Sequence, residues 1–542
     1  MKNFDIQFLI QIILKKLIEY SIIFTQHILF NMAYKDISIE LPTDYSEADL
    51  REKVKKQLGI NNFSYQIENK SLDARNKSRI HWLIRVGVYS DELKGTNPEP
   101  LPTLQIDYKK RNKKIVVVGS GPAGFFSAYI LQKAGFNVTL VERGCDVNTR
   151  DEGIKKFEKT GVFDTKNNYA FGEGGAGTFS DGKLTSRSKH ISIEKQFILQ
   201  SYIEAGAPEE IAYLARPHVG SDNLKKIVKN LRQEFKNTGG KFLFETQLVN
   251  LIINKNKVKE AILDQGSLDA DYFIIASGHS AFETYRMLIK QGIPFRTKNF
   301  AIGSRIEHHQ EIINVAQWGK KQLPGVKAAE YRLTSNPENS LPVYTFCMCP
   351  GGIVVPATAY SNTNIVNGMS LYGRNAQFAN AACVAGVNPE KLMGREITAL
   401  EMLNWLEGLE QKFYGFSKGY SAPYCSIQDF ISKKEPQKKT RTSYPLGLNA
   451  APLWEMLPEP VSNSMRKGLL DFCRKIKGFE TGNIMGLESK TSSPIQVLRE
   501  ENLAVTGFEN LFIVGEGSGY AGGIISSGAD GIKAAMSIIN YH

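Results

Sequence analysis

The sequence predicts an α/β protein in which a three-layer Rossmann-like domain carries an inserted substrate domain and follows a small N-terminal α/β module. Two observations support this prediction. An apolar run at 115–118 leads through a Gly-x-Gly-x-x-Gly turn into an apolar helix, which is how doubly wound α/β units begin. A strand, a glycine-rich turn and a helix then return at 510–542, after a long mixed region. This return indicates one domain assembled from two separate segments.

The composition is that of a globular protein with a basic surplus. The 542 residues are 23% charged and 42% apolar, and the formal net charge is +12. Such a composition excludes wholesale disorder and fibrous repeats. Two runs, 109–114 with five positive charges and 433–441 with a net four, hold nine of the twelve. Neither run has interleaved aromatic residues, so we expect no nucleic-acid partner.

The six cysteines are too sparse for a disulfide framework and indicate a reducing cytoplasm. Cys347 and Cys349 form a Cys-x-Cys pair in an apolar run typical of a strand. A regular strand keeps the two Cα atoms about 6.6 Å apart with parallel side chains, whereas a disulfide needs Cβ atoms about 3.8 Å apart. Buried apolar thiols are therefore favoured over a redox relay. No Cys-x-x-Cys is present, and we expect no metal site.

The first 31 residues are apolar but contain no membrane span. Lys15, Lys16 and Glu19 interrupt their Ile, Leu and Phe residues, and a span needs about 20 apolar residues in succession. A small-residue cleavage site is also missing. We interpret 1–31 as a leader upstream of a functional start at Met32, with a membrane-surface helix as the alternative.

The pattern of strands, helices and linkers divides the rest of the chain into three expected domains, one of which is made of two segments. The linker is marked by Pro-rich sequence at 97–102 and the basic run at 109–114. The expected domains are a small α/β domain at 34–108, a Rossmann-like domain made of 111–281 and 501–542, and an inserted substrate or cap domain at 282–500.

The first of three Gly-x-Gly-x-x-Gly matches has the full context of a dinucleotide-binding fingerprint. Gly119 permits the tight turn, Gly121 lets the backbone approach a pyrophosphate, and Gly124 lets the helix lie close to the strand. The helix, expected from about 123 to 134, would direct its N-terminus at the phosphates.

A second strand, expected at 137–141, ends in an acidic residue. Glu142 lies where a carboxylate binds ribose hydroxyls in such folds. Arg143 follows it, with a role near the adenosine or a solvated loop position as alternatives.

The other two matches lack this context. No apolar strand precedes the glycines at 172–177, which lie in the glycine-dense segment 171–184. A strand precedes 517–522 and a helix follows from about Ser527, but the chain ends before another strand and ribose-binding acid. Dense glycine indicates backbone that closely approaches another group, so both segments require a role within a larger site.

Seven patterns, taken in order, resemble those of a family of largely uncharacterised bacterial FAD-dependent dehydrogenases within the glutathione-reductase-type NAD(P)/FAD-dependent oxidoreductases. They are VVVGSGPAGFFSAYILQKAG with VER, FGEGGAGTFSDGKL, RPHVGSD, FIIASGHSAFETY, AIGSRIEHHQ, VYTFCMCPGGIVV and FIVGEGSGYAGGIISSGADG. The resemblance covers about residues 34–542. It implies a glutathione-reductase-type FAD-binding fold and FAD-dependent oxidoreductase activity.

The resemblance also implies how non-covalent FAD is held. Glu516 stands where the wider superfamily usually has Asp and would hold the ribityl chain or pyrophosphate, while Ser277 keeps only the hydroxyl of the usual Thr. The C-terminal helix would stabilise negative charge on the reduced ring. The cofactor contacts expected from the fingerprint and the resemblance together are Gly119, Gly121, Pro122, Ala123, Gly124, Glu142, Arg143, Gly172, Gly174, Gly175, Gly177, Ser180, Asp181, Leu248, Ser277, Gly278, Gly515, Glu516, Gly522, Gly523 and Ile524.

The sequence does not single out a catalytic acid or base, because flavin itself carries the hydride or electrons. His218, His279 and His308 are candidates for proton transfer, with a structural histidine as the alternative at each position. Arg216 and Arg305 could hold a substrate carboxylate or form ordinary ion pairs.

The electron partner and substrate stay open at this stage. A dedicated nicotinamide domain is not expected, because there is one complete fingerprint, although NAD(P)H could dock transiently as a donor. A quinone, a ferredoxin or a small organic substrate within 282–500 are the other partners, and the oligomeric state is open. The alternative to an enzyme is a redox-responsive flavoprotein that acts as a binding or RNA-associated factor.

Overall fold

The computed structural model describes residues 32–95, 102–436 and 440–542, and it divides into two compact units. The first unit comprises Met1–Pro102 with two short segments, Tyr213–Ala215 and Pro324–Val326; the second comprises the rest. The proposed leader at 1–31 lies outside the described residues, as do most of the Pro-rich stretch and residues 437–439 of the second basic run.

The small unit is a three-stranded antiparallel sheet with one helix. Its elements are β1 (Ala33–Leu41), α2 (Glu47–Leu58), β2 (Ser64–Asp73) and β3 (His81–Ser90), and the strand order is β1-β3-β2. Ser46 begins α2 through a reciprocal capping box with Asp49, and Gly59 ends it in the left-handed conformation at φ 69°. These are the boundaries that the sequence predicts for the helix.

The second unit contains a five-stranded parallel sheet in the order β21-β10-β4-β5-β6. Its strands are β4 (Lys114–Val118), β5 (Asn137–Val141), β6 (Lys241–Leu243), β10 (Tyr272–Ile275) and β21 (Leu511–Ile513). The C-terminal β21 pairs with β10 and so completes a sheet begun by residues almost 400 positions earlier. Buried apolar residues fill β4, as expected for a parallel strand covered on both faces.

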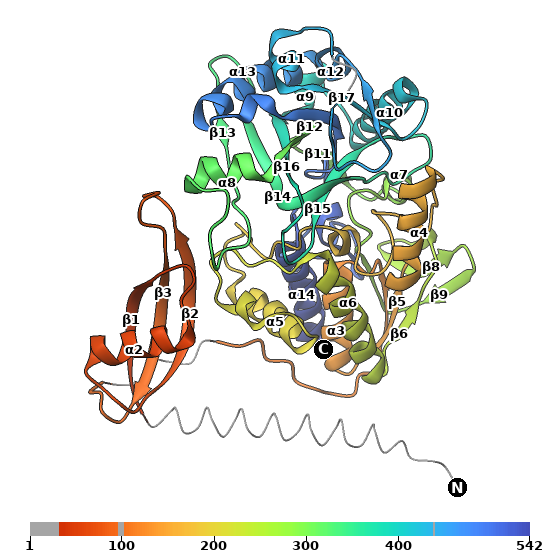
Figure 1. The fold of residues 1–542 in the computed structure, drawn as a ribbon. Helices are drawn as coiled ribbons and strands as arrows, with labels where there is room; N and C mark the ends of the chain where they lie inside the picture. Colours follow the sequence, from red (N-terminus) through yellow and green to blue (C-terminus); the bar gives the residue numbers. More distant parts are fainter. Residues whose placement is uncertain (1–31, 96–101, 437–439) are drawn as a thin grey trace. The chain divides into compact units, whose positions relative to one another are not determined.

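Helices pack on this sheet and closely on each other. Figure 1 shows α3 (Pro122–Lys133), α5 (Ser192–Glu204), α6 (Gly220–Asn237) and α14 (Ile524–Tyr541) gathered in the lower part of the unit. The helices α3 and α14 meet where Gly531 faces Ala123: a Cβ on Gly531 would lie 2.0 Å from the Ala123 carbonyl oxygen. The helix α14 begins at Ile524, three residues before the predicted start at Ser527.

Smaller elements flank this core. An antiparallel sheet consists of β7 (Leu248–Asn254), β8 (Lys257–Leu263) and β9 (Gly266–Asp269), and the adjoining helices are α4 (Val147–Thr160) and α7 (Phe282–Lys290). The short 3₁₀ turns are η1 (Ala176–Phe179), η2 (Glu209–Ala212), η3 (Phe479–Thr481) and η4 (Glu516–Ser518). A two-stranded ribbon joins β11 (Phe295–Thr297) to β20 (Ile495–Val497).

Residues 300–488 form an eight-stranded sheet, in the upper part of Figure 1. Its path is β13-β14-β16-β12-β19-β17-β18, with β15 paired to β14. The strands are β12 (Phe300–His309), β13 (Thr334–Ser335), β14 (Val343–Pro356), β15 (Val366–Ser370), β16 (Phe378–Val387), β17 (Ala422–Ser426), β18 (Leu448–Ala450) and β19 (Asn483–Glu488). The accompanying helices are α8 (Gln310–Trp318), α9 (Pro389–Met393), α10 (Ala399–Ser417), α11 (Ile427–Ser432), α12 (Leu453–Met456) and α13 (Glu459–Lys475).

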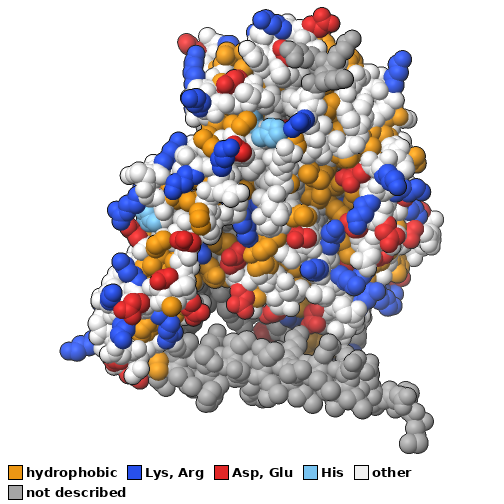
Figure 2. All heavy atoms as spheres, in the orientation of Figure 1, with side chains coloured by type: hydrophobic (Ala, Val, Ile, Leu, Met, Phe, Trp, Pro, Cys, Tyr) orange, Lys and Arg blue, Asp and Glu red, His pale blue; other side chains and the backbone are white. Residues whose placement is uncertain are grey.

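The parallel sheet and the eight-stranded sheet belong to the same compact unit. The domain boundaries at 281/282 and 500/501 therefore stay predictions. Among the described residues, no helix is long and apolar enough to cross a bilayer. Basic and acidic side chains are interspersed on the face shown in Figure 2.

We predict that Gly531→Val destabilises the protein, because the new side chain must displace the Ala123 backbone or α14. Overpacking of this kind costs about 1–3 kcal/mol, and urea unfolding measures it. The matched control is Gly408→Ala in α10, where no atom lies within 4 Å of an added Cβ. The control should be neutral or stabilising by up to about 1 kcal/mol. Equal stabilities for Gly531→Val and the wild type would contradict the close packing.

Candidate functional site

Three glycine segments that are far apart in the sequence converge beside the carboxyl ends of β4, β10 and β21. Gly121 approaches Gly175, such that a Cβ on Gly121 would lie 3.8 Å from the Gly175 Cα. Gly515 lies against Ala123, and Gly177 lies against Ile524 at the start of α14. The carboxyl edge of a parallel sheet is where such folds bind ligands.

The glycines at this edge border open space and helix N-termini. An added Cβ would meet no atom within 4 Å at Gly278 or Gly523, and at Gly522 it would meet the Glu516 carboxylate at 3.9 Å. Gly121 and Gly523 are the N-cap residues of α3 and α14, and neither helix has a side-chain cap. Free N–H groups at two helix starts favour anionic groups. The site therefore fits a dinucleotide with a diphosphate near α3 and an electron-accepting ring near α14.

Glu142 follows β5 and is buried, and its carboxylate already accepts four hydrogen bonds. Oε2 accepts from the Ser120 N–H at 2.9 Å and from its hydroxyl at 2.7 Å. Oε1 accepts from the N–H groups of Gly144 and Gly172, each at 3.0 Å. Glu142 thus joins the fingerprint turn to the glycine-rich loop, and a ribose hydroxyl would have to replace one of these donors.

Arg143 directly follows Glu142 after β5, and Leu248 begins β7 of the separate antiparallel sheet. The Arg143 guanidinium stacks over Phe171 at 3.9 Å and pairs with Glu283 on α7. This contact excludes the freely solvated loop position considered from the sequence. Leu248 begins β7 and is buried; its contact with the adenine stays a prediction.

Arg150 holds the glycine-rich loop and was missed from the sequence. Its side chain on α4 is 0% exposed. It donates to the carbonyls of Asn168, Tyr169, Glu173 and Gly175 at 2.8–2.9 Å. It also stacks over Phe179 at 4.7 Å. One arginine in a polar helix gives no sequence signal, because its partners are backbone oxygens of a distant loop.

The loop glycines adopt conformations that support this geometry. Gly172, Gly174 and Gly175 have φ values of 113°, 76° and 66°, which side chains with a Cβ rarely adopt. The Glu173 carboxylate between them accepts from the Val147 N–H at the start of α4, at 2.7 Å. These contacts and backbone conformations therefore hold the loop in one defined structure, unlike a mobile surface loop.

Asp181 and Ser180 serve the loop's own structure. Asp181 is buried, pairs with Lys183 at 2.8 Å and Arg374 at 2.6 Å, and accepts from the Ser370 hydroxyl. These cations hold the pKa of Asp181 well below its usual range, against the effect of burial. Ser180 donates to the Gly177 carbonyl at 2.7 Å. Both side chains therefore have structural roles in the loop, and their contact with the cofactor stays a prediction.

His279 is the predicted histidine that lies at the site. It follows Gly278 at the carboxyl end of β10, and its Nδ1 is 3.4 Å from a Glu516 carboxylate oxygen. Its Nε2 is buried and has no hydrogen-bond partner in the described structure. Ser277, two residues before, donates to the Tyr285 hydroxyl at 3.3 Å. Its position beside Glu516 and the open glycines keeps His279 as the candidate histidine at this edge.

His218 and His308 are buried histidines with backbone partners. The Nε2 of His308 contacts the Phe479 carbonyl at 2.8 Å, and that of His218 contacts the Tyr372 carbonyl at 3.2 Å. Burial lowers the pKa of each to about 4. Both are neutral at pH 7, which favours the structural alternative.

Arg305 is also engaged entirely within the protein. Its guanidinium, 0% exposed, pairs with Glu488 at 3.1 Å and donates to Asn380, Asn367 and the Cys347 carbonyl. Arg216 is exposed and pairs with Glu330 at 2.5 Å. The prediction that Arg305 clamps a substrate carboxylate is therefore corrected: its donors are occupied.

The expectation of regular strand geometry at Cys347 and Cys349 is wrong. Cys347 has φ 44°, and the pairing of β14 with β16 shifts register between Phe346 and Cys349. This β-bulge turns the two thiols toward each other, whereas a regular strand would hold them apart. The bulge depends on how β14 pairs with β16, which is distant in the sequence, so periodicity alone misses it.

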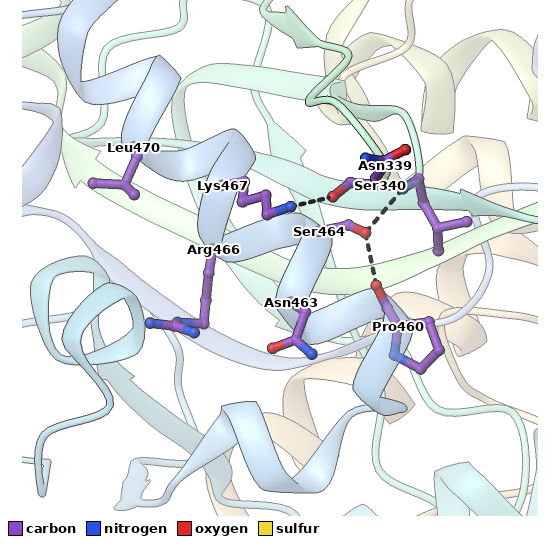
Figure 3. A pocket seen from close by; sticks show the side chains of 9 residues that line it. Asn339, Ser340, Pro460, Asn463, Ser464, Arg466, Lys467 and Leu470 are labelled. Carbon is purple, nitrogen blue, oxygen red and sulfur yellow. Dashed lines mark hydrogen bonds between the residues drawn. The ribbon is translucent and has the colours of Figure 1, made fainter.

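A surface groove of about 730 Å³ lies elsewhere, between α13 and residues 339–341 (Figure 3). Its polar groups bond to each other: Lys467 donates to the Ser340 hydroxyl at 2.9 Å, and Ser464 donates to the Pro460 carbonyl at 2.7 Å. It contains none of the predicted site residues, so the glycine-lined edge remains the candidate site.

Three family models match the chain. Residues 113–315 match "Pyridine nucleotide-disulphide oxidoreductase", residues 299–491 match "FAD-dependent protein, C-terminal domain-like", and residues 33–89 match "Domain of unknown function (DUF8436)". A protein of Clostridium beijerinckii described as "Uncharacterized protein" is 36% identical over 530 residues, covering 94% of this chain and 99% of its own.

The chain therefore belongs with that relative to a family of FAD-dependent oxidoreductases, and its cofactor is FAD. Its fold is the α/β, Rossmann-like FAD-binding fold that the sequence predicts.

Solved structures resemble the chain only at low identity and low TM-score. L-proline dehydrogenase from P. horikoshii is 12% identical with a TM-score of 0.34, covering 80% of this chain and 95% of its own. A geranylgeranyl bacteriochlorophyll reductase-like protein from Thermoplasma acidophilum is 14% identical with a TM-score of 0.36, covering 80% and 79%. Likenesses at this level carry no statement about substrate.

We predict that Arg150→Gln lowers retained FAD about tenfold or more, because buried carbonyls of the loop lose a charged donor worth about 1.5–3 kcal/mol per bond. The flavin-to-protein ratio after desalting measures it. Arg187→Gln, an exposed position shortly after the loop, is the control and should keep its FAD. Circular dichroism distinguishes loss of the cofactor from loss of the fold. A fully loaded, folded Arg150→Gln protein would disprove this role.

We predict that buried His308 makes stability depend on pH between about 6.5 and 4. The unfolded histidine binds a proton below about 6.5, whereas the native one does so only near its pKa of about 4. Stability is complete above that window and is lost as pH falls through it, by about 3 kcal/mol. Urea unfolding of wild type and His308→Gln at pH 7 and pH 4.5 tests this. The variant should lose less stability on acidification, and parallel losses would contradict the prediction.

Proposed function

We propose that this FAD-dependent oxidoreductase binds FAD non-covalently and moves a hydride or electrons between it and a small organic substrate or electron partner. The observation that carries the proposal is the convergence of Gly121, Gly175, Gly515 and Gly177 at one sheet edge with two uncapped helix starts. Flavin supplies the redox chemistry, and the protein binds, orients and tunes it.

The residues nearest the reacting ring would be those at the start of α14. The dipole of this 18-residue helix favours negative charge at Gly523 and Ile524. His279 and Glu516 lie beside the same edge and could hold a proton for transfer to or from a substrate. The arrangement therefore supports reduction and oxidation of the ring.

The eight-stranded sheet supplies the substrate side in this proposal. Its strand β15 reaches the flavin loop through Ser370 and Asp181, and its β14 reaches it through Met348 and Lys183. A substrate bound over the ring would lie between these strands and the glycine loop. The proposed electron partner is a pyridine nucleotide. It would dock transiently, because the one complete nucleotide fingerprint is assigned to FAD.

We predict that anaerobic addition of NADH or NADPH bleaches the flavin absorbance at about 450 nm. Stopped-flow absorbance with each nucleotide measures the rate and the preference. If neither nucleotide reduces the flavin while dithionite does, the pyridine-nucleotide part of the proposal fails. Purified protein that never contains FAD would overturn the proposal as a whole.

We predict that His279→Gln slows substrate-linked flavin turnover about 10²-fold, within the range for loss of a general acid or base, while FAD content stays unchanged. Product formation with a reduced or oxidised test substrate and the flavin-to-protein ratio are the two measurements. His309→Gln in β12 is the control. Unchanged turnover in His279→Gln would remove His279 from the proposed chemistry.

A further inference from the structure

Cys347 and Cys349 lie in a bulged strand that brings two thiols into one polar cluster. The left-handed backbone of Cys347 and the register shift of β14 interrupt regular alternation. The Cys349 sulfur lies 3.3 Å from the Cys347 carbonyl oxygen and 3.4 Å from Arg305 Nη2. Cys349 is 0% exposed, whereas Cys347 is half-buried.

Two cations make this cluster suitable for a thiolate. Lys183 donates to the Met348 carbonyl, between the two cysteines, and Arg305 donates to the Cys347 carbonyl at 2.7 Å. A hydrogen bond from the Cys349 thiol, with help from these cations, lowers the pKa of Cys347 to about 5, while the pKa of Cys349 is raised. One thiolate beside one thiol is the protonation state from which a disulfide forms.

The cluster lies next to the flavin-binding loop. Segment 177–186 is fixed to the start of α14 at both ends: Gly177 lies against Ile524, and the hydroxyls of Ser186 and Ser526 are 2.9 Å apart. Lys183 lies between these two points, and its side chain reaches the peptide between the cysteines. A single lysine side chain therefore connects this segment, which is proposed to border the ring, to the peptide between the two cysteines.

We propose that Cys347 and Cys349 are a redox-active pair that exchanges two electrons with the flavin. The inference deepens the proposed function and rests on FAD binding at the glycine-lined edge. The pair lies on β14 of the eight-stranded sheet, and the loop at 171–184 has no cysteine. The proposed exchange thus takes place between thiols of the eight-stranded sheet and FAD bound at the carboxyl edge of the parallel sheet.

The step balances in atoms and electrons. The Cys347 thiolate and the Cys349 thiol form an S–S bond, and the Cys349 S–H bond breaks. Two electrons and that proton pass to oxidised FAD, which becomes the anionic two-electron-reduced flavin. The reverse step uses reduced flavin to restore the thiolate and thiol.

Reductive titration of the oxidised holoenzyme tests the exchange. Anaerobic titration with dithionite should consume twice as many electrons per chain as FAD alone requires. Cys347→Ser and Cys349→Ser should each consume only the FAD equivalent. Cys473→Ser, a half-buried cysteine on α13, should behave as the wild type.

A mass measurement gives a readout that does not depend on flavin activity. Trypsin releases residues 333–374 as one peptide that contains Cys347 and Cys349 and no other cysteine. After oxidation and alkylation, this peptide should be lighter by two hydrogen atoms and unlabelled; after reduction, it should carry two labels.

Two labels on this peptide from oxidised protein, with a titration equal to FAD alone, would overturn the inference. Flavin reduction by NADH or NADPH in that same protein would leave the proposed function standing. Conversely, a disulfide in the peptide without any reducible flavin would overturn the exchange and the proposed function together. Folding of the serine variants is checked by their retained FAD.

Discussion

The hydrogen bonds from buried Arg150 to the glycine-rich loop are the constraint on which the site depends. Four carbonyls between Asn168 and Gly175 accept from one guanidinium that is 0% exposed. Burial lowers the pKa of Arg150 to about 10, which still leaves it charged at pH 7. Buried charge is tolerated when every donor is paired, so the loop and the arginine stabilise each other. Gly175 is thereby held against the fingerprint turn at Gly121.

A second buried ionic cluster joins the flavin loop to the eight-stranded sheet. Asp181 lies between Lys183 and Arg374, and Ser370 of β15 donates to the same carboxylate. The sheet strands β14 and β15 are thus fixed relative to segment 181–183, and the bulge at Cys347 lies at the end of the lysine side chain. Asp181, which the sequence predicts as a cofactor contact, thus connects the flavin loop to the eight-stranded sheet within one unit.

Local signals in the sequence were sufficient for most elements. Ser46 and Gly59 bound α2, and the apolar run 115–118 with its glycines gave β4 and the start of α3. The same logic failed at the cysteines, because a bulge depends on how β14 pairs with β16. It also could not separate His279 from His308, since exposure to the site is decided by neighbours distant in sequence.

By itself the sequence determined the class of protein. The strand, the three spaced glycines, the helix, the second strand and its terminal acid at 115–142 are local features that together specify a nucleotide-binding unit. The tertiary structure alone decided which charged residues are free. Arg305 and Asp181 carry the right chemistry for ligand binding, yet their partners Glu488 and Arg374 come from other strands and loops. Hydrogen-bond capacity is finite, and only the folded chain shows where it is already used.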